Sequence, residues 1–73
     1  MTDKILATDT WETALGGKAV TQYIIREGRV CVMGEGTTLS EIIENDNCHD
    51  ALERIRKKLK RTWVLLKSEE MVD

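Results

Sequence analysis

The sequence predicts an α+β domain in which a small antiparallel β-sheet packs against a short helix and a longer C-terminal helix. Two observations carry this fold class. Two runs rich in β-branched residues flank the pair Glu27-Gly28, and an apolar stripe of helical spacing begins at Cys48. The chain has 73 residues, enough for one domain. We therefore expect residues 1–73 to form a single domain whose ends, 1–5 and 68–73, are loosely held.

Composition points to a folded chain with little stability to spare. Hydrophobic residues make up 41% of the sequence and charged residues 33%, which is enough apolar material for a core. A core of this size supplies no more than about 3–5 kcal/mol of net stability. Domains this small therefore usually rely on a disulfide, a structural metal ion or a partner chain for additional stability. The longest apolar run, residues 63–66, falls far short of the ~20 residues of a membrane span. We expect a soluble, cytoplasmic protein.

The N-terminal third allows two interpretations. Residues 10–15, followed by Gly16-Gly17, fit a first strand that turns into a second one. The pattern Asp9-x-x-Glu12 is also a capping box, which would open a helix over the same segment. We favour the strand, because a three-stranded meander holds a sheet better than an isolated hairpin.

The clearest β-structure is a hairpin formed by residues 19–26 and 29–33, with Glu27-Gly28 as a two-residue loop. Such a loop fixes the register and the two faces of the hairpin. One face then carries the pairs Ile25–Val30 and Tyr23–Val32, and the other carries Ile24–Cys31 and Gln22–Met33. Because both faces hold apolar residues, we expect helices or another chain to cover the sheet on more than one side.

Residues 37–45 are expected to form the short helix. Thr38 and Glu41 fit a capping box, and Leu39, Ile42 and Ile43 would share one helical face. This helix would end at Asn45.

The second helix begins after Asn47, a good N-cap residue. Its apolar stripe consists of Cys48, Leu52, Ile55 and Leu59. We expect the helix to extend through Arg61. Beyond that point, Trp63 and Leu66 continue the stripe, whereas residues 62–64 have strand propensity. We favour a helix that continues to Ser68.

Charge is strongly segregated along the second half of the chain. Residues 30–53 contain six acidic residues and no lysine or arginine, and residues 54–67 contain seven basic residues and no acid. Helices commonly place bases near their C-terminus, so a solvated face is the simplest interpretation. A basic ridge at helical spacing would also suit phosphate binding. This ridge consists of Arg54, Lys57, Lys58 and Arg61.

Residues capable of catalysis or metal binding are few. Cys31, Cys48 and His49 offer three nitrogen or sulfur ligands, one fewer than a structural zinc site requires. Cys48 and His49 are adjacent, and adjacent residues on a helix point about 100° apart, which does not suit a nucleophile and its base. We expect no enzyme activity, no metal and no cofactor.

These observations favour a non-enzymatic protein-binding regulatory or accessory module that self-associates. The second face of the hairpin supplies the candidate protein-binding residues Ile24, Cys31 and Met33. The alternative is a small nucleic-acid-binding module that uses the basic ridge. The acidic segments that flank the ridge make nucleic acid the less favoured partner.

Overall fold

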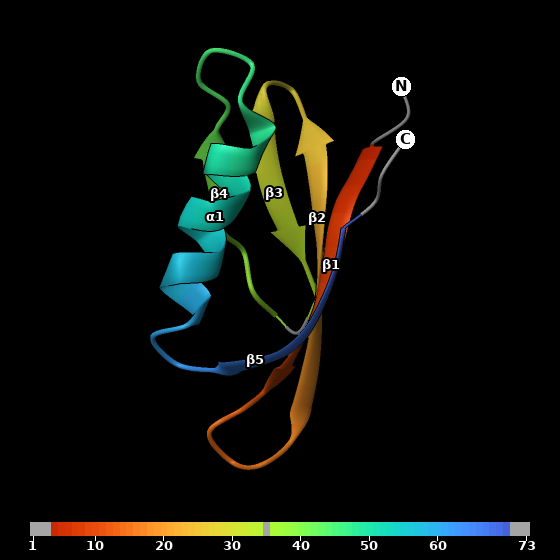
Figure 1. Cartoon of the computed structure of the whole chain (residues 1–73), viewed down its shortest axis with the longest axis vertical. Coiled ribbons are helices and arrows are strands. Elements are labelled where there is room, and N and C mark those ends of the chain that lie inside the picture. The colour runs from red at the N-terminus through yellow and green to blue at the C-terminus, as the bar shows by residue number, and fades with distance from the viewer. Residues whose placement is uncertain (1–3, 35, 71–73) are drawn as a thin grey trace.

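The computed structural model describes residues 4–34 and 36–70, which form five strands and one helix (Figure 1). In chain order the elements are β1 (Lys4–Glu12), β2 (Lys18–Arg26), β3 (Arg29–Met33), β4 (Ser40–Ile42), α1 (Cys48–Leu59) and β5 (Val64–Glu70). The strands form one antiparallel sheet in the order β4-β3-β2-β1-β5. The last strand therefore lies beside the first, and α1 crosses one face of the sheet between the two edge strands (Figure 1).

The predicted fold class is wrong in its helices. The described chain contains one short helix, not two, and a larger sheet than a hairpin or meander. Both errors arise where a segment that contains apolar residues at helical spacing is recruited to an edge of the sheet. The pairing of backbone groups along a strand edge is the interaction that the sequence pattern did not reveal.

The hairpin forms with the predicted register. Glu27 and Gly28 both have positive φ, at 49° and 75°, as a type I′ turn requires. Tyr23 lies opposite Val32, and Ile24 lies opposite Cys31. The two-residue loop thus sets the two faces of the hairpin as the sequence indicates.

The first strand also forms, and the capping-box alternative is wrong. β1 covers residues 4–12, so it begins and ends earlier than the strand expected over residues 10–15, and residues 13–17 form the turn into β2. The Thr13 side chain stabilises this turn, because its hydroxyl accepts a hydrogen bond from the Gly17 amide at 3.1 Å. An irregularity between Ile5 and Ala7 shifts the β1–β2 register by one residue.

The short helix expected at residues 37–45 does not form. Residues 40–42 instead make β4, which pairs with β3. Burial alternates here with period two. Leu39 and Ile43 pack against the core, and Ile42 is exposed on the opposite side. Asn45 and Asp46, both with positive φ, then turn the chain into α1.

The C-terminal helix ends at Leu59, and its predicted continuation to Arg61 and on to Ser68 is wrong. The Thr62 and Trp63 amides both donate to the Leu59 carbonyl, which closes a turn after the helix. Trp63 and Leu65 then alternate toward the core as the chain enters β5, and Leu66 is exposed. Strand propensity and pairing with β1 outweigh the helical spacing of Trp63 and Leu66.

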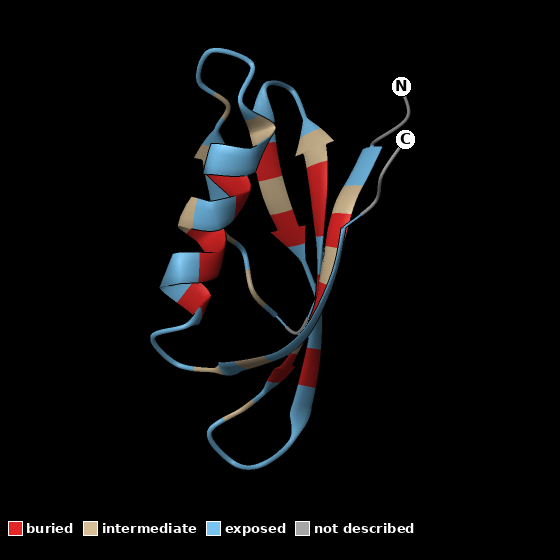
Figure 2. Cartoon of the chain, viewed as in Figure 1, coloured by how far each residue is buried: buried red, intermediate tan, exposed pale blue. Residues whose placement is uncertain are grey.

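The core lies between α1 and the covered face of the sheet, where the buried residues of the helix and strands meet (Figure 2). Leu52, Ile55 and Leu59 are buried on the helix side, together with Tyr23 and Val30 on the sheet side. Trp11 is fully buried and packs against Trp63, with ring centroids 6.2 Å apart.

The ends of the described chain belong to the sheet. Residues 4–5 open β1 and residues 68–70 close β5; the rest of the terminal segments expected to be loose, 1–3 and 71–73, lie outside the described residues. Across residues 4–34 and 36–70, no helix has the length and apolar character needed to cross a bilayer.

Two leucines give a matched test of this core. Leu59 is 7% exposed in α1, and Leu66 is 48% exposed in β5. We expect Leu59→Ala to lower the free energy of unfolding by about 2–5 kcal/mol, because it opens a cavity in the core. Leu66→Ala should change it by no more than about 0.5 kcal/mol in the same urea titration. Equal effects from the two substitutions would contradict the difference in burial between these side chains.

Candidate functional site

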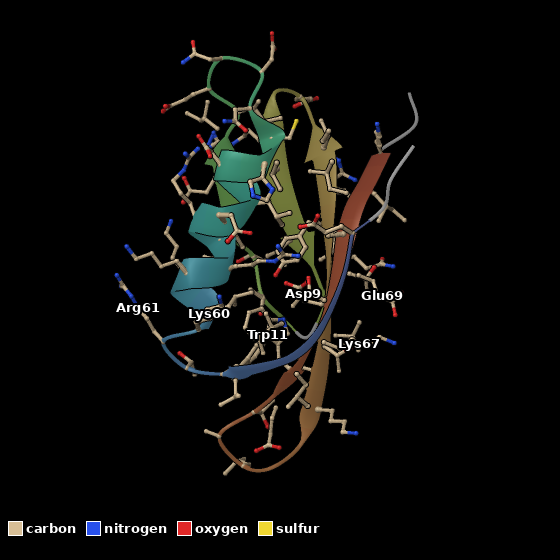
Figure 3. All side chains as sticks on the ribbon, in the orientation of Figure 1. Asp9, Trp11, Lys60, Arg61, Lys67 and Glu69 are labelled. Carbon is tan, nitrogen blue, oxygen red and sulfur yellow. The ribbon has the colours of Figure 1, made fainter. Side chains whose placement is uncertain are left out.

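A buried ion pair connects α1 to the middle of the sheet. Asp9 of β1 is fully buried, and Arg56 of α1 is 5% exposed. Arg56 donates from Nε to Asp9 Oδ2 at 2.7 Å and from Nη2 to Asp9 Oδ1 at 2.9 Å. This two-point geometry is the strongest form of guanidinium–carboxylate contact. Figure 3 shows Asp9 and Trp11 on the side of the sheet that faces the helix.

A chain of polar side chains continues from Asp9 into β2. The Trp11 indole Nε1 donates to the Thr21 hydroxyl at 2.9 Å, and Thr21 donates to the Tyr23 hydroxyl at 3.2 Å. Tyr23 in turn donates to Asp9 Oδ2 at 2.8 Å. Each side chain in this series packs in the core and donates a hydrogen bond to the next one. Among the described residues, no buried side-chain nitrogen or oxygen lacks a hydrogen bond.

Arg56 also fastens the edge strand β5. Its Nη2 donates to the Ser68 hydroxyl at 2.6 Å, and Ser68 donates to Asp9 Oδ1 at 2.7 Å. Its Nη1 donates to Glu53 Oε1 at 2.9 Å and to Glu70 Oε1 at 3.3 Å. These bonds and the two to Asp9 occupy all five N–H donors that a guanidinium has.

The network sets the charge states of its members. Burial by itself would raise the pKa of Asp9, but hydrogen bonds from Arg56, Ser68 and Tyr23 and the charge of Arg56 hold that pKa below its ordinary value. Burial and the neighbouring Asp9 carboxylate raise the pKa of the Tyr23 hydroxyl, which therefore keeps its proton. Burial would lower the pKa of Arg56, but its hydrogen bonds to Asp9 and Glu53 raise it.

No described segment covers the opposite face of the sheet (Figure 1). This face carries exposed apolar side chains. Ile5 of β1, Val20 of β2 and Met33 of β3 are 40%, 45% and 50% exposed. The strand register places all three on the face that points away from α1. We call these three residues, together with Ile24 and Cys31, the open sheet face.

The structure brings the predicted protein-binding residues together on this face. Ile24 and Cys31 lie directly opposite each other, and Met33 lies two residues beyond Cys31. Ile24 is only 4% exposed because it sits in the central strand between Ile5 and Cys31. Cys31 is partly exposed, and Met33, at 50%, is the most accessible of the three. Their part in binding stays a prediction.

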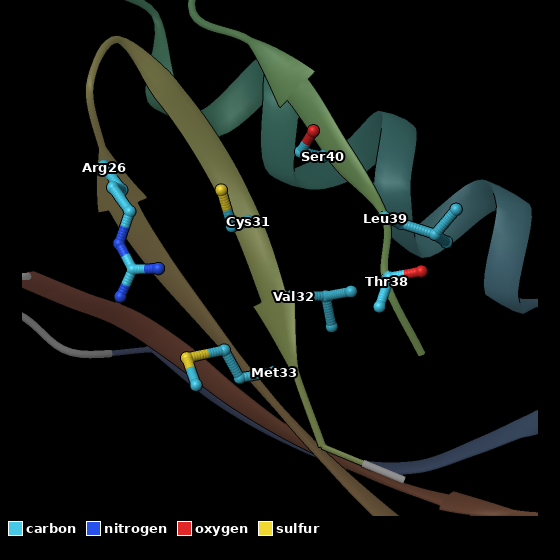
Figure 4. A pocket seen from close by; sticks show the side chains of 7 residues that line it. All are labelled: Arg26, Cys31, Val32, Met33, Thr38, Leu39 and Ser40. Atoms are coloured by element: carbon cyan, nitrogen blue, oxygen red, sulfur yellow. The ribbon is translucent and has the colours of Figure 1, made fainter. Parts of the chain in front are cut away.

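One side of the open sheet face borders a hollow of about 230 Å³, smaller than the ~300–1,000 Å³ typical of small-molecule sites. Figure 4 shows Cys31 and Met33 on the side that also carries Arg26, with Val32 pointing the other way. The hollow is lined by Arg26, Cys31, Val32, Met33, Thr38, Leu39 and Ser40.

The predicted basic ridge is partly engaged by acidic and carbonyl oxygens. Arg54 donates to the Ile42 carbonyl at 2.7 Å and contacts Glu41 at 3.4 Å, and Lys58 also pairs with Glu41. Lys58, followed by Arg54, lowers the pKa of the Glu41 carboxyl. Lys57 and Arg61 are exposed near the end of α1. The ridge therefore carries less net charge than its sequence indicates.

The three residues with nitrogen or sulfur ligand atoms do not gather. Cys31 and Cys48 are free thiols; Cys31 lies on the open sheet face, and Cys48 packs against the core on the helix side. His49 instead lies beside two carboxylates, Glu53 of α1 and Glu70 of β5. A count restricted to nitrogen and sulfur ligands could not reveal this group, because Glu70 is brought to it by the unpredicted strand β5.

Asp9 and Arg56 are the principal residues that the sequence analysis missed. The sequence patterns present Asp9 only as a capping residue and Arg56 only as one of many bases. A signal was present in each case: Asp9 alternates with Ala7 and Trp11 in a strand, and Arg56 adjoins Ile55 of the apolar stripe.

Comparisons with protein-family models, curated proteins and solved structures found no match to the chain.

The lowered pKa of Asp9 makes stability depend on pH. A carboxyl whose pKa is lower in the folded protein adds stability that is complete above its unfolded pKa, near 3.8, and is lost as the pH falls through the folded pKa. We expect wild type to be more stable than Asp9→Asn at neutral pH, and urea titrations should show this difference shrinking below about pH 4. A difference that stays constant down to about pH 2 would contradict a charged Asp9 in the folded protein.

Proposed function

We propose that this chain is a non-enzymatic protein-binding module that self-associates through its open sheet face. The observation that carries the proposal is the presence of three half-exposed apolar side chains, Ile5, Val20 and Met33, on the face opposite α1. Large apolar side chains that are grouped and exposed on a sheet surface are typical of protein contacts, whereas a solvated sheet face normally carries polar residues.

A second copy of the chain is the occupant that best suits this face. The core of one copy is small, so association supplies burial that a single copy lacks. A two-fold dimer needs only one self-complementary patch, and face-to-face packing of two sheets buries the central rows of both. Met33 and Val20 would lie in such an interface, and Ile24 would support them from below.

Catalysis and nucleic-acid binding have less support. The hollow beside β3 is small, and Cys31 is the only nucleophilic thiol among its lining residues. Two of the four ridge residues, Arg54 and Lys58, already contact Glu41. Phosphate groups would have to compete with Glu41 for these two side chains. A ridge that binds fewer phosphates has both a lower affinity for nucleic acid and a weaker salt dependence.

Sedimentation of two glutamate variants tests the proposal. We expect wild type to sediment as a dimer or larger assembly in the micromolar range and Met33→Glu to sediment as a monomer, because a charge in an apolar interface is costly to desolvate. The matched control is Leu15→Glu, which places the same charge in the β1–β2 turn, where Leu15 is 99% exposed. Leu15→Glu should associate as wild type does.

Wild type that remains monomeric throughout the micromolar range would overturn the proposal. Equal association of the wild type and Met33→Glu would place the interface elsewhere. Salt-sensitive binding of a DNA duplex that is abolished by Lys57→Glu would instead favour the basic ridge.

A further inference from the structure

Three side chains from two elements present metal-ligand atoms to one point on the helix side of the sheet. His49 and Glu53 are four residues apart, so they share one face of α1. Glu70 reaches the same point from β5. One ligand atom from each of the three residues lies within 4.8 Å of the other two.

Arg56 orients both carboxylates of this group from beneath. Its Nη1 donates to Oε1 of Glu53 and to Oε1 of Glu70. Because a carboxylate has two oxygens with several acceptor sites, each glutamate can hold this bond and still offer an oxygen to a metal ion. Polar groups that hold carboxylate ligands in place in this way are a regular part of metal sites. Because Arg56 is itself fixed by Asp9, the two glutamates are held by a rigid, buried support.

The charges of the group also suit a cation. Within the network, Asp9, Glu53 and Glu70 share the single guanidinium of Arg56, so the carboxylates exceed the cation by two charges. A divalent ion at the outer side of Glu53 and Glu70 would balance this excess. An imidazole nitrogen of His49 would supply a third ligand atom without adding a further negative charge.

We propose that His49, Glu53 and Glu70 form a binding site for a divalent transition-metal ion of the zinc class. One imidazole nitrogen and two carboxylate oxygens are a ligand set that Zn²⁺ accepts, and the fourth position would hold water. Zinc bonds of about 2.0–2.2 Å separate tetrahedral ligands by roughly 3.4 Å, so the three atoms need only converge slightly. All three residues are exposed, which leaves their side chains room for this movement.

Metal bound at this point would link β5 directly to α1. β5 is an edge strand that pairs only with β1, and its contacts to the helix network run through Ser68 and Glu70. The ion would therefore act as a staple in a domain too small to depend on its core alone. The site lies on the helix side of the sheet, so it is independent of self-association through the open sheet face.

Titration of the 73-residue chain with ZnCl₂ tests the site, with calorimetry for affinity and the ring signals of His49, its only histidine, as a direct probe. We expect one zinc ion per chain, a shift of the His49 ring signals and a rise in Tm with added zinc. His49→Ala should weaken binding by at least about tenfold, the lower end of the loss seen when even a supporting contact of a metal site is removed. Glu70→Gln should weaken it similarly.

Two variants serve as controls. Glu69→Gln removes the same charge from the neighbouring position of β5, where Glu69 pairs with Lys67 and not with this group, and should bind zinc as wild type does. Cys48→Ala removes the adjacent thiol and should also leave zinc binding unchanged. Zinc binding that survives His49→Ala, or that disappears in Cys48→Ala but not in Glu70→Gln, would overturn the proposed ligand set. Absence of any wild-type binding would overturn the site itself.

Discussion

The contact between Asp9 and Arg56 is the constraint on which the arrangement of this domain depends. A carboxylate with no exposed surface is stable as an anion only if each oxygen is satisfied, and Arg56 reaches both oxygens at once. Among the described residues, Arg56 is the one cation that forms an ion pair with Asp9. The position of α1 over the sheet is thereby fixed to a single register, because sliding the helix by one turn would separate the pair.

The same contact helps to explain why residues 64–70 form a strand. β5 is exposed along most of its length and contributes little apolar burial. It is held by pairing with β1, by partial burial of Leu65 and by the bonds from Arg56 to Ser68 and Glu70. Polar contacts thus hold the edge strand β5 on the sheet, where hydrophobic packing alone would hold it only weakly.

The two faces of the sheet consequently have different chemistry. The helix side is closed by the core and the polar network, and charged residues of α1 and β5 cover its rim. The other side carries half-exposed apolar side chains and lacks a covering helix among the described residues. Lys67 and Glu69, which pair with each other at 2.7 Å, border this side along β5 (Figure 3). The two faces of the sheet thus differ: one presents apolar side chains, and the other has a rim of charged side chains.

Local signals in the sequence predict the parts of this fold that local interactions determine. The type I′ loop at residues 27–28 sets the hairpin, and the stripe that includes Leu52 and Ile55 sets the helix from Cys48 to Leu59. Residues 40–42 and 64–70 could not be predicted in the same way. Their strand conformation depends on pairing with β3 and β1. Pairing of this kind produces no periodic pattern in the sequence of either edge strand.

The candidate sites show the same contrast between local and long-range interactions. The part of the open sheet face formed by Ile24, Cys31 and Met33 follows from hairpin alternation alone. Asp9 and Arg56, in contrast, are 47 positions apart, and a single sequence does not indicate which base will meet a given acid.

A double-mutant cycle on Asp9 and Arg56 tests the central claim most directly. Asp9→Asn, Arg56→Met and the double variant would be compared by urea unfolding, with sucrose added so that each variant starts folded. If the pair organises the domain, each single substitution is expected to cost about 3–5 kcal/mol, because it leaves a buried group without its partner. The second substitution should then add much less than it does alone. Effects that add to within about 0.5 kcal/mol would show that the two residues act independently, and would contradict the organising role of the pair.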